Sequence, residues 1–201
     1  MNADGDRYTT LDVSHAIWDR FFWVAPLLVI GTKEPDGSYD LAPKHMATPL
    51  GWENYFGFVC TPRHATYRNA IREHAFTVSY PRPDQLVHTS LSAEPRCEDG
   101  HKTSIVNLPV IPGEVVAGPL LDGAYVHLEC KLDRIVEGFG ENGLVIGSIV
   151  AARVHEDALR RRAREDQRLI AKHPLLAYLA PGQYAIIDKG QNFPFPSGFA
   201  K

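Results

Sequence analysis

Short apolar segments joined by tight turns recur along the chain, and this spacing most constrains its fold. Residues 27–32 and 38–41 are joined by an EPDG turn, in which proline fixes φ and glycine accepts a positive φ. Further strands are predicted at residues 55–60, 76–80, 124–136, 144–154 and 183–188. Hairpin turns between closely spaced strands favour an antiparallel barrel over a βαβ fold. The sequence therefore predicts a mainly β chain with a few peripheral helices.

Three helices are predicted around this barrel, at residues 12–22, 66–73 and 157–172. Residues 81–118 are rich in proline, glycine and charge, and predict long loops with one or two short elements. Loop-rich inserts of this kind are often functional or face a partner. The sequence contains no internal repeat and no linker, so we expect residues 1–201 to form a single domain.

The third predicted helix is dense in arginine and raises the question of a polyanionic partner. The i,i+4 pairs Arg161–Glu165 and Arg162–Asp166 favour a solvated helix face over a surface for nucleic acid or an acidic protein. A formal net charge of −3 also gives the chain no global basic field. We therefore expect no nucleic-acid partner.

Composition places the chain among ordinary globular proteins, with 44% hydrophobic and 22% charged residues. Its N-terminus has neither a basic segment nor an apolar segment typical of a signal peptide, and three cysteines are an odd number for a disulfide framework. The longest apolar run, residues 23–31, is too short to cross a bilayer, which needs about 20 residues. None of the nine histidines has a metal-binding spacing. These features predict a cytoplasmic protein with no membrane span and no metal.

Two polar clusters lie where the predicted strands end, and both are suited to an anion. The first contains Lys44, His45 and Thr48. The second contains Thr61, Arg63, His64 and Thr66, and it leads directly into the helix predicted from residue 66, with Thr66 as its N-cap. Unpaired N–H groups at a helix start carry partial positive charge and bind phosphate. The alternative is a capped surface helix with solvated basic residues.

The same two clusters carry a resemblance to a known family. Residues 40–45, DLAPKH, are similar to a loop of the type N-x-A-P-x-S, with Asp40 in place of asparagine and His45 in place of serine. Residues 63–69, RHATYRN, are similar to a turn of the type R-K-D-T-x-x-N. With the flanking segments, the chain resembles the flavin reductase-like family of FMN-binding split barrels over most of residues 20–155.

The resemblance implies a split, Greek-key-like antiparallel β-barrel that forms a homodimer with FMN, rather than FAD, near the interface. It implies that the first loop lines the flavin ring and ribityl chain, and that the second turn holds the phosphate. The cofactor-binding residues implied are Lys44, His45, Met46, Ala47, Thr48, Thr61, Arg63, His64, Thr66 and Asn69.

The resemblance also implies an activity, namely reduction of bound flavin by NAD(P)H with transfer of electrons onward, in some cases to a partner monooxygenase. Residues 138–143 form a literal G-x-G-x-x-G, but a strand follows them, so they predict a hairpin turn rather than a dinucleotide site. At this turn the family often carries G-D-H-x-L-x-I-G, and Asn142 stands here in place of the histidine. An electron carrier, flavin store or redox sensor therefore remains an alternative, as does a split barrel that has lost flavin.

No catalytic acid or base is predicted, because in a flavoprotein the cofactor performs the redox chemistry. The C-terminal segment NFPFPSGF, residues 192–199, carries three phenylalanines in a frame set by proline. We expect it to cross a subunit interface or to shield the flavin, because an exposed apolar segment of this kind needs a contact surface.

Overall fold

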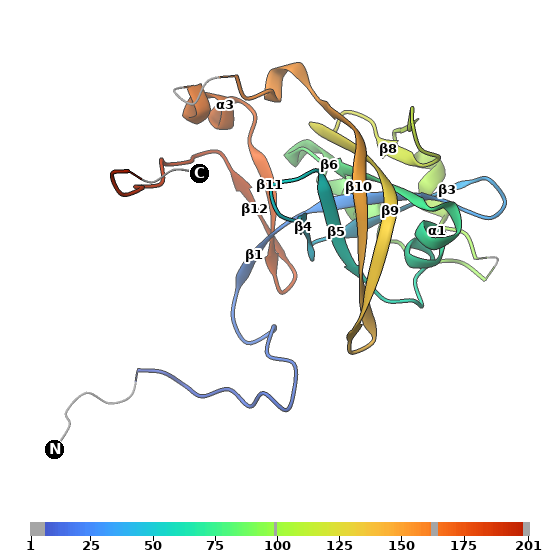
Figure 1. Cartoon of the computed structure of the whole chain (residues 1–201), viewed down its shortest axis with the longest axis horizontal. Coiled ribbons are helices and arrows are strands. Elements are labelled where there is room, and N and C mark those ends of the chain that lie inside the picture. The colour runs from blue at the N-terminus through green and yellow to red at the C-terminus, as the bar shows by residue number, and fades with distance from the viewer. Residues whose placement is uncertain (1–6, 99, 162–164, 199–201) are drawn as a thin grey trace.

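A seven-stranded antiparallel sheet dominates the computed structural model, which describes residues 7–98, 100–161 and 165–198 (Figure 1). Its strands, in spatial order, are β3 (Tyr39–Lys44), β2 (Leu28–Lys33), β6 (Ala75–Tyr80), β9 (Val126–Phe139), β10 (Asn142–Val154), β5 (Tyr55–Cys60) and β4 (Ala47–Pro49). The two edge strands, β3 and β4, follow each other in the chain with only His45 and Met46 between them. The sheet must therefore curl until its edges meet at this corner, which confirms the predicted split β-barrel.

Two smaller sheets accompany the barrel. One contains β1 (Trp23–Pro26), β11 (Leu175–Ala180) and β12 (Gln183–Ile187), and the other contains β7 (Val110–Pro112) and β8 (Pro119–Leu121). Of these five strands, only β12 was predicted. The sequence of β11, LLAYLA, is rich in leucine and alanine, which have high helix propensity, so its strand conformation depends on pairing with β1 and β12.

Strand β2 lies between two hydrophobic cores, because successive side chains of a strand point to opposite faces. Leu28 and Ile30 contribute to the larger core inside the barrel, with Phe56, Phe58 and Phe76. The opposite face carries Val29, which packs with a second cluster that contains Leu41, Leu108, Leu121 and Ala124. The residues of the 81–118 insert that follow β6 thus cover the outer face of β2 and β3.

Gly31 allows β8 to cross closely over β2. A Cβ atom at this position would lie 2.0 Å from the carbonyl oxygen of Pro119 and 2.4 Å from Oγ1 of Thr77. Only glycine avoids both clashes, and the crossing brings the rest of the insert against β2 and β3.

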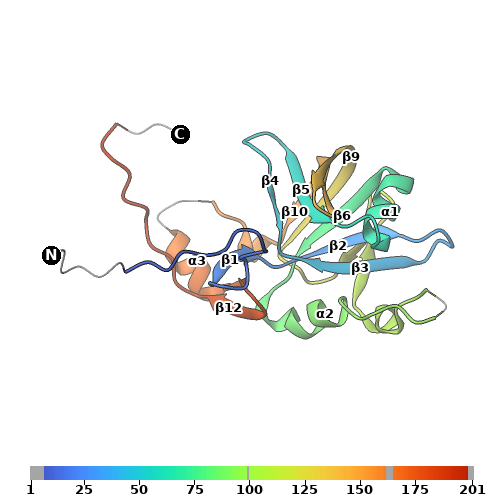
Figure 2. The same ribbon diagram turned by 90° about the horizontal axis from the view of Figure 1, so that it is seen from below.

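The helices are α1 (Ala65–Glu73), α2 (Leu86–Leu91) and α3 (Asp166–Lys172), with short 3-10 turns at η1 (Pro83–Gln85), η2 (Thr103–Asn107) and η3 (Glu156–Ala158). Viewed from below, α1 and α2 lie on opposite sides of the β2–β3 hairpin (Figure 2). Loops join the short elements of residues 81–118 as predicted, but the described residues form four such elements, η1, α2, η2 and β7, where one or two were predicted. None of the helices in the described part of the chain is long and apolar enough to span a membrane.

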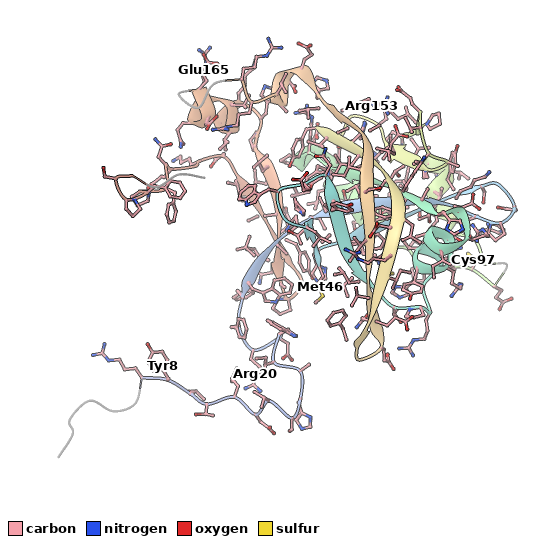
Figure 3. The ribbon with its side chains drawn as sticks, in the orientation of Figure 1. Tyr8, Arg20, Met46, Cys97, Arg153 and Glu165 are labelled. Atoms are coloured by element: carbon pink, nitrogen blue, oxygen red, sulfur yellow. The ribbon has the colours of Figure 1, made fainter. Side chains whose placement is uncertain are left out.

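The prediction of a helix at residues 12–22 was wrong, because this segment forms successive turns. Oδ1 of Asp12 accepts the Ser14 N–H at 2.9 Å, which favours a local turn over a helix. The segment around Tyr8 and Arg20 extends away from the barrel (Figure 3), and Val13 and Phe22 are exposed. A short helix without a packed face is not stable in water.

The prediction of one long arginine-rich helix at residues 157–172 was also wrong. A 3-10 turn ends at Ala158, and the next helix described is α3, which begins at Asp166. Arg160 pairs with Asp166 at 2.8 Å and Arg161 pairs with Glu156, so the predicted pairing of Arg161 with Glu165 does not form. Arg162 and Arg164 lie outside the described residues.

The β9–β10 hairpin confirms the turn predicted from the glycine pattern. Gly138 and Gly140 have φ values of 101° and 64°, which favour glycine. Three register irregularities between the strands increase their twist, and the hairpin tip extends beyond the barrel (Figure 1). In the C-terminal segment, Phe193 and Phe195 contact each other and are 70% and 47% exposed.

Candidate functional site

The free edge of β3 lines a cavity of about 440 Å³. Strand β3 pairs with β2 on one side only, and its other edge is covered by the start of α1 and by the described residues, 92–98 and 100–102, of the 92–102 segment. Pro43 fits this edge because it has no N–H to leave unpaired. The lining residues are Asp40, Ala42, Pro43, Lys44, Arg63, His64, Ala65, Thr66, Arg68, Ser92, Ala93, Glu94, Pro95, Arg96 and Lys102. Four of the ten residues predicted to bind the cofactor, Lys44, Arg63, His64 and Thr66, are therefore brought together here.

The start of α1 lines the cavity with His64, Ala65 and Thr66. The N-cap is His64 rather than the predicted Thr66, and the His64 side chain makes no capping hydrogen bond. Thr66 lies in the first turn, where its hydroxyl contacts Oδ2 of Asp40 at 3.3 Å. A nine-residue helix whose N-cap side chain makes no capping hydrogen bond presents partial positive charge to an anion.

Arg63 and Arg68 add cationic groups to this helix start. Arg68 donates to the carbonyl oxygens of Pro62 and Arg63, which supports the turn before the helix. Arg63 forms an ion pair with Glu141 of the β9–β10 turn, but the two side chains are 72% and 73% exposed. An exposed pair of this kind contributes little to stability, so Arg63 can exchange Glu141 for another anion at small cost.

Lys44 ends β3 at the opposite side of the helix start, and its charge acts on three neighbours. Burial lowers the pKa of His64, and the positive charge of Lys44 lowers it further. Burial and Lys44 likewise lower the pKa of His45. Burial raises the pKa of the Cys60 thiol, which Lys44 opposes. His64 is therefore a neutral imidazole at pH 7, and the fixed cations of this wall are Lys44, Arg63 and Arg68.

The opposite wall is attached through a buried ion cluster. Asp40 is 2% exposed and forms ion pairs with Arg96 at 3.1 Å and with Lys102 at 3.0 Å. Arg96 also pairs with Glu34 at 2.5 Å. Lys102 donates to the carbonyl oxygens of Leu41 and Ser92 at 2.7 and 2.9 Å. Two acids thus neutralise two bases, and the cluster joins β3 to the 92–102 segment.

Reasoning from the sequence missed this second wall. Arg96 and Lys102 belong to the loop-rich insert, whose composition marked it as functional or partner-facing without indicating which of its residues reach the barrel. Arg68 was missed as well, although it lies inside the RHATYRN segment at the helix start. A signal was present in Asp40, because a carboxylate within a predicted strand needs a cation partner once it is buried.

The remaining residues predicted for the flavin ring lie at the corner between β3 and β4, outside the cavity. His45 stacks between Trp23 and Tyr178, with ring centroids 5.6 and 4.5 Å away. Ala47 is buried and Thr48 is exposed on β4. Met46 projects into the space between the small β1–β11–β12 sheet and the β9–β10 hairpin (Figure 3). Flavin contacts at these four positions stay predictions.

Thr61 and Asn69 also lie outside the cavity and support the wall formed by α1 and its preceding turn. Oγ1 of Thr61 accepts the Arg63 N–H at 3.5 Å within the turn. Asn69 is buried, donates to Thr32 at 3.2 Å and accepts from Arg72 at 2.8 Å. These contacts anchor α1 to β2, and direct flavin contacts of the two residues stay predictions.

The tip of the β9–β10 hairpin lies beside Arg63, which lines the cavity. Besides the Arg63–Glu141 pair, the Tyr67 hydroxyl donates to Glu137 at 3.0 Å, so two contacts connect the hairpin with α1. Asn142 is the first residue of β10, is exposed, and immediately follows Glu141. The residue that stands in place of the family's histidine therefore directly follows the acid that pairs with Arg63.

The donor set of this cavity fits a phosphate monoester. It combines an uncapped helix start, Arg63, Lys44 and the neutral imidazole of His64, all of which donate hydrogen bonds or positive charge. A cavity of 440 Å³ is within the usual range for a small organic ligand, roughly 300–1,000 Å³. The arrangement can thus hold a phosphorylated small molecule along the edge of β3.

Comparison with known proteins gives a family match and a set of similar structures. The model of the Flavin reductase like domain matches residues 23–184. Nitrilotriacetate monooxygenase component B from Bacillus cereus has a TM-score of 0.78 at 18% identity, with 95% of this chain and 100% of that chain covered. Flavoredoxin from Methanosarcina acetivorans has a TM-score of 0.75 at 18% identity, with 96% and 98% covered.

An FMN-binding protein from Thermus thermophilus, solved with bound p-hydroxybenzaldehyde, has a TM-score of 0.71 at 20% identity, with 96% of this chain and 100% of that chain covered. At identities this low, the structural matches establish the fold. No curated protein sequence matches the chain.

Proposed function

The chain belongs to the flavin reductase-like family, and from this we propose that it is an FMN-dependent oxidoreductase that takes electrons from NAD(P)H. The observation that carries the proposal is the cationic cavity at the uncapped start of α1, whose donors suit the phosphate of FMN. Similar structures described as a flavoredoxin and as an FMN-binding protein support a flavin ligand.

We assign the phosphate to Arg63, His64 and the first backbone N–H groups of α1, including that of Thr66. The flavin ring would extend from the cavity past Lys44 along the corner of residues 44–48, where backbone groups and the stacked His45 set its position. The flavin, when bound, supplies the redox chemistry, and the protein binds, orients and shields it. The chain itself then needs no acid or base for electron transfer.

We also propose that the chain is a homodimer located in the cytoplasm. Trp52 is 95% exposed in the β4–β5 turn, and Phe193 and Phe195 are exposed in the C-terminal segment, so a second copy would cover apolar surface that this chain leaves open. Cys60, Cys97 and Cys130 are free thiols, as is typical of a reducing compartment. We propose a partner monooxygenase as one candidate for the protein that accepts electrons from the reduced flavin.

A second candidate function is a flavin-binding electron carrier or redox sensor that does not use NAD(P)H. Asn142 favours it, because this exposed amide next to Glu141 stands in place of the family's histidine and cannot change its charge near pH 7. If the protein does not bind the cofactor, we would conclude that it is a split barrel that has lost flavin.

The test is the visible spectrum of the purified protein, followed by anaerobic addition of NADH or NADPH. We expect a yellow protein that bleaches at a catalytic rate, and light scattering on the same sample should give twice the chain mass of 22.4 kDa. A yellow protein that stays oxidised supports the carrier. A protein that remains colourless after incubation with FMN contradicts the proposed function.

Replacing Lys44 with methionine should lower the reduction potential of bound flavin by about 30 mV or more, or about 1.4 kcal/mol for a two-electron couple. Lys44 lines the cavity, and its positive charge lowers the pKa values of His45 and His64; the same charge would favour the anionic reduced flavin. Potentiometric titration measures the change. Replacement of the exposed Lys131 is the matched control, and an unchanged potential in the Lys44 variant would remove this role.

A further inference from the structure

The wall formed by residues 92–102 is held against β3 by one buried carboxylate. Asp40 contacts Arg96 and Lys102 of this segment, and Lys102 uses further hydrogen bonds to the carbonyl oxygens of Leu41 on β3 and Ser92 in the wall. Arg96 reaches back to Glu34 at the end of β2. The wall is therefore fixed at Arg96 and at Lys102 by ion pairs with two buried acids.

The same carboxylate fixes the wall relative to the start of α1. Oδ2 of Asp40 accepts from the Thr66 hydroxyl in the first turn of that helix, while its other oxygen faces Arg96 and Lys102. The segment of residues 92–96 consequently lines the cavity that the helix start also lines. On the other side, the Tyr67 hydroxyl of α1 donates to Glu137 at 3.0 Å and holds the β9–β10 hairpin near this helix. A phosphate at the helix start would thus lie between two tethered segments.

The pairing is a feature of this chain's own residues. Within the loop that resembles N-x-A-P-x-S, asparagine is replaced by Asp40. A neutral amide would not need two cations, whereas a carboxylate that is 2% exposed requires them. The acid at position 40 and the cations at positions 96 and 102 therefore act as one unit, and the unit closes the cavity.

We propose that the segment of residues 92–102, held by Asp40, selects a flavin mononucleotide over the dinucleotide. In FMN the phosphate is the end of the molecule, whereas in FAD the chain continues from this phosphate to an adenosine. Because Ser92, Glu94 and Arg96 line the same cavity as the start of α1, a chain that continues from a phosphate held there would meet the 92–96 segment. This inference rests on the proposed flavin site and specifies which residues limit its ligand.

The wild-type protein provides the first test, with dissociation constants for FMN and FAD measured by flavin fluorescence. We expect FMN to bind at least about tenfold more tightly than FAD. Equal affinities would overturn the selection and leave flavin binding intact. Binding of neither flavin would instead contradict the proposed function, so the two failures are distinguishable.

The second test is Asp40→Asn, which removes the charge and keeps the shape of the side chain. We expect the preference for FMN to fall at least threefold, and hydrogen exchange of the backbone amides in residues 92–102 to become faster. Both flavins carry phosphate charge, so the altered charge at position 40 affects both affinities and largely cancels in their ratio. A loosened segment with an unchanged ratio overturns the proposal, and so does a segment that is not loosened.

Two further variants make the result independent of the folding of Asp40→Asn. Arg96→Met removes one cation of the cluster and should reduce the ratio in the same direction. Asp133→Asn makes the same chemical change at a half-exposed acid on β9, which pairs only with its neighbour Arg134 at 3.4 Å among the ion pairs of the described residues, and should leave the ratio unchanged. A fall of the same size in Asp133→Asn would overturn the assignment to the wall.

Discussion

Replacing Arg63 with methionine should weaken FMN binding at least about tenfold while leaving riboflavin binding nearly unchanged. Hydrogen bonds to charged groups contribute about 1.5–3 kcal/mol. Riboflavin has no phosphate, so it makes no such hydrogen bond to Arg63 and should be unaffected. Arg63 lies at the uncapped start of α1 and its side chain is 72% exposed, so its removal should not unfold the protein. Quenching of flavin fluorescence gives both dissociation constants.

The matched control for this experiment is Arg134→Met on β9. Arg134 is an exposed arginine with 69% of its side chain accessible, and like Arg63 it pairs with a neighbouring acid. We expect this variant to bind both flavins as the wild type does. If Arg63→Met weakened FMN and riboflavin equally, the phosphate would have to lie elsewhere in the cavity.

Replacing Glu129 with alanine should lower the free energy of unfolding by about 3 kcal/mol. Glu129 is 2% exposed on β9, and its carboxylate accepts the N–H groups of Glu114, Val115 and Val116 at 3.1, 2.6 and 2.8 Å. These donors belong to the turn between β7 and β8, and each buried donor left unpaired costs about 1–3 kcal/mol. Urea denaturation measures the change, and Glu129→Gln, which keeps one acceptor oxygen, should lose less. A loss below about 1 kcal/mol would show that the turn finds other acceptors.

The same carboxylate gives a pH dependence with a definite sign. Burial raises the pKa of Glu129. The N–H groups of the β7–β8 turn and the charge of Arg153 lower this pKa by more than burial raises it, so the net pKa is below the ordinary value of 4.5. A folded-state pKa below the unfolded value means that the contribution is complete above about pH 4.5 and is lost as the pH falls through the folded-state pKa. The acid sensitivity of the wild type should therefore be reduced in Glu129→Gln.

Much of the fold follows from local patterns. The EPDG turn, the glycines of residues 138–143 and the apolar runs between them specify hairpins, and hairpins specify an antiparallel sheet. Helix α1 follows from residues that also define the anion cluster. The wrong predictions of secondary structure occur where packing against the rest of the chain, rather than the local sequence pattern, decides the conformation. Residues 12–22 have helical periodicity but no surface to pack against, and residues 175–180 have helical composition but pair as a strand between two others.

The candidate site divides in the same way. The sequence alone determined one wall, because Lys44, Arg63, His64 and Thr66 lie at strand and helix ends, whose geometry is local. Only the tertiary structure decided the second wall, which depends on Arg96 meeting Glu34 across 62 residues and on both Arg96 and Lys102 meeting the buried Asp40. Local propensity acts over a few residues, whereas a buried charge finds its partner only when the barrel has curled and the insert has closed over the free edge of β3.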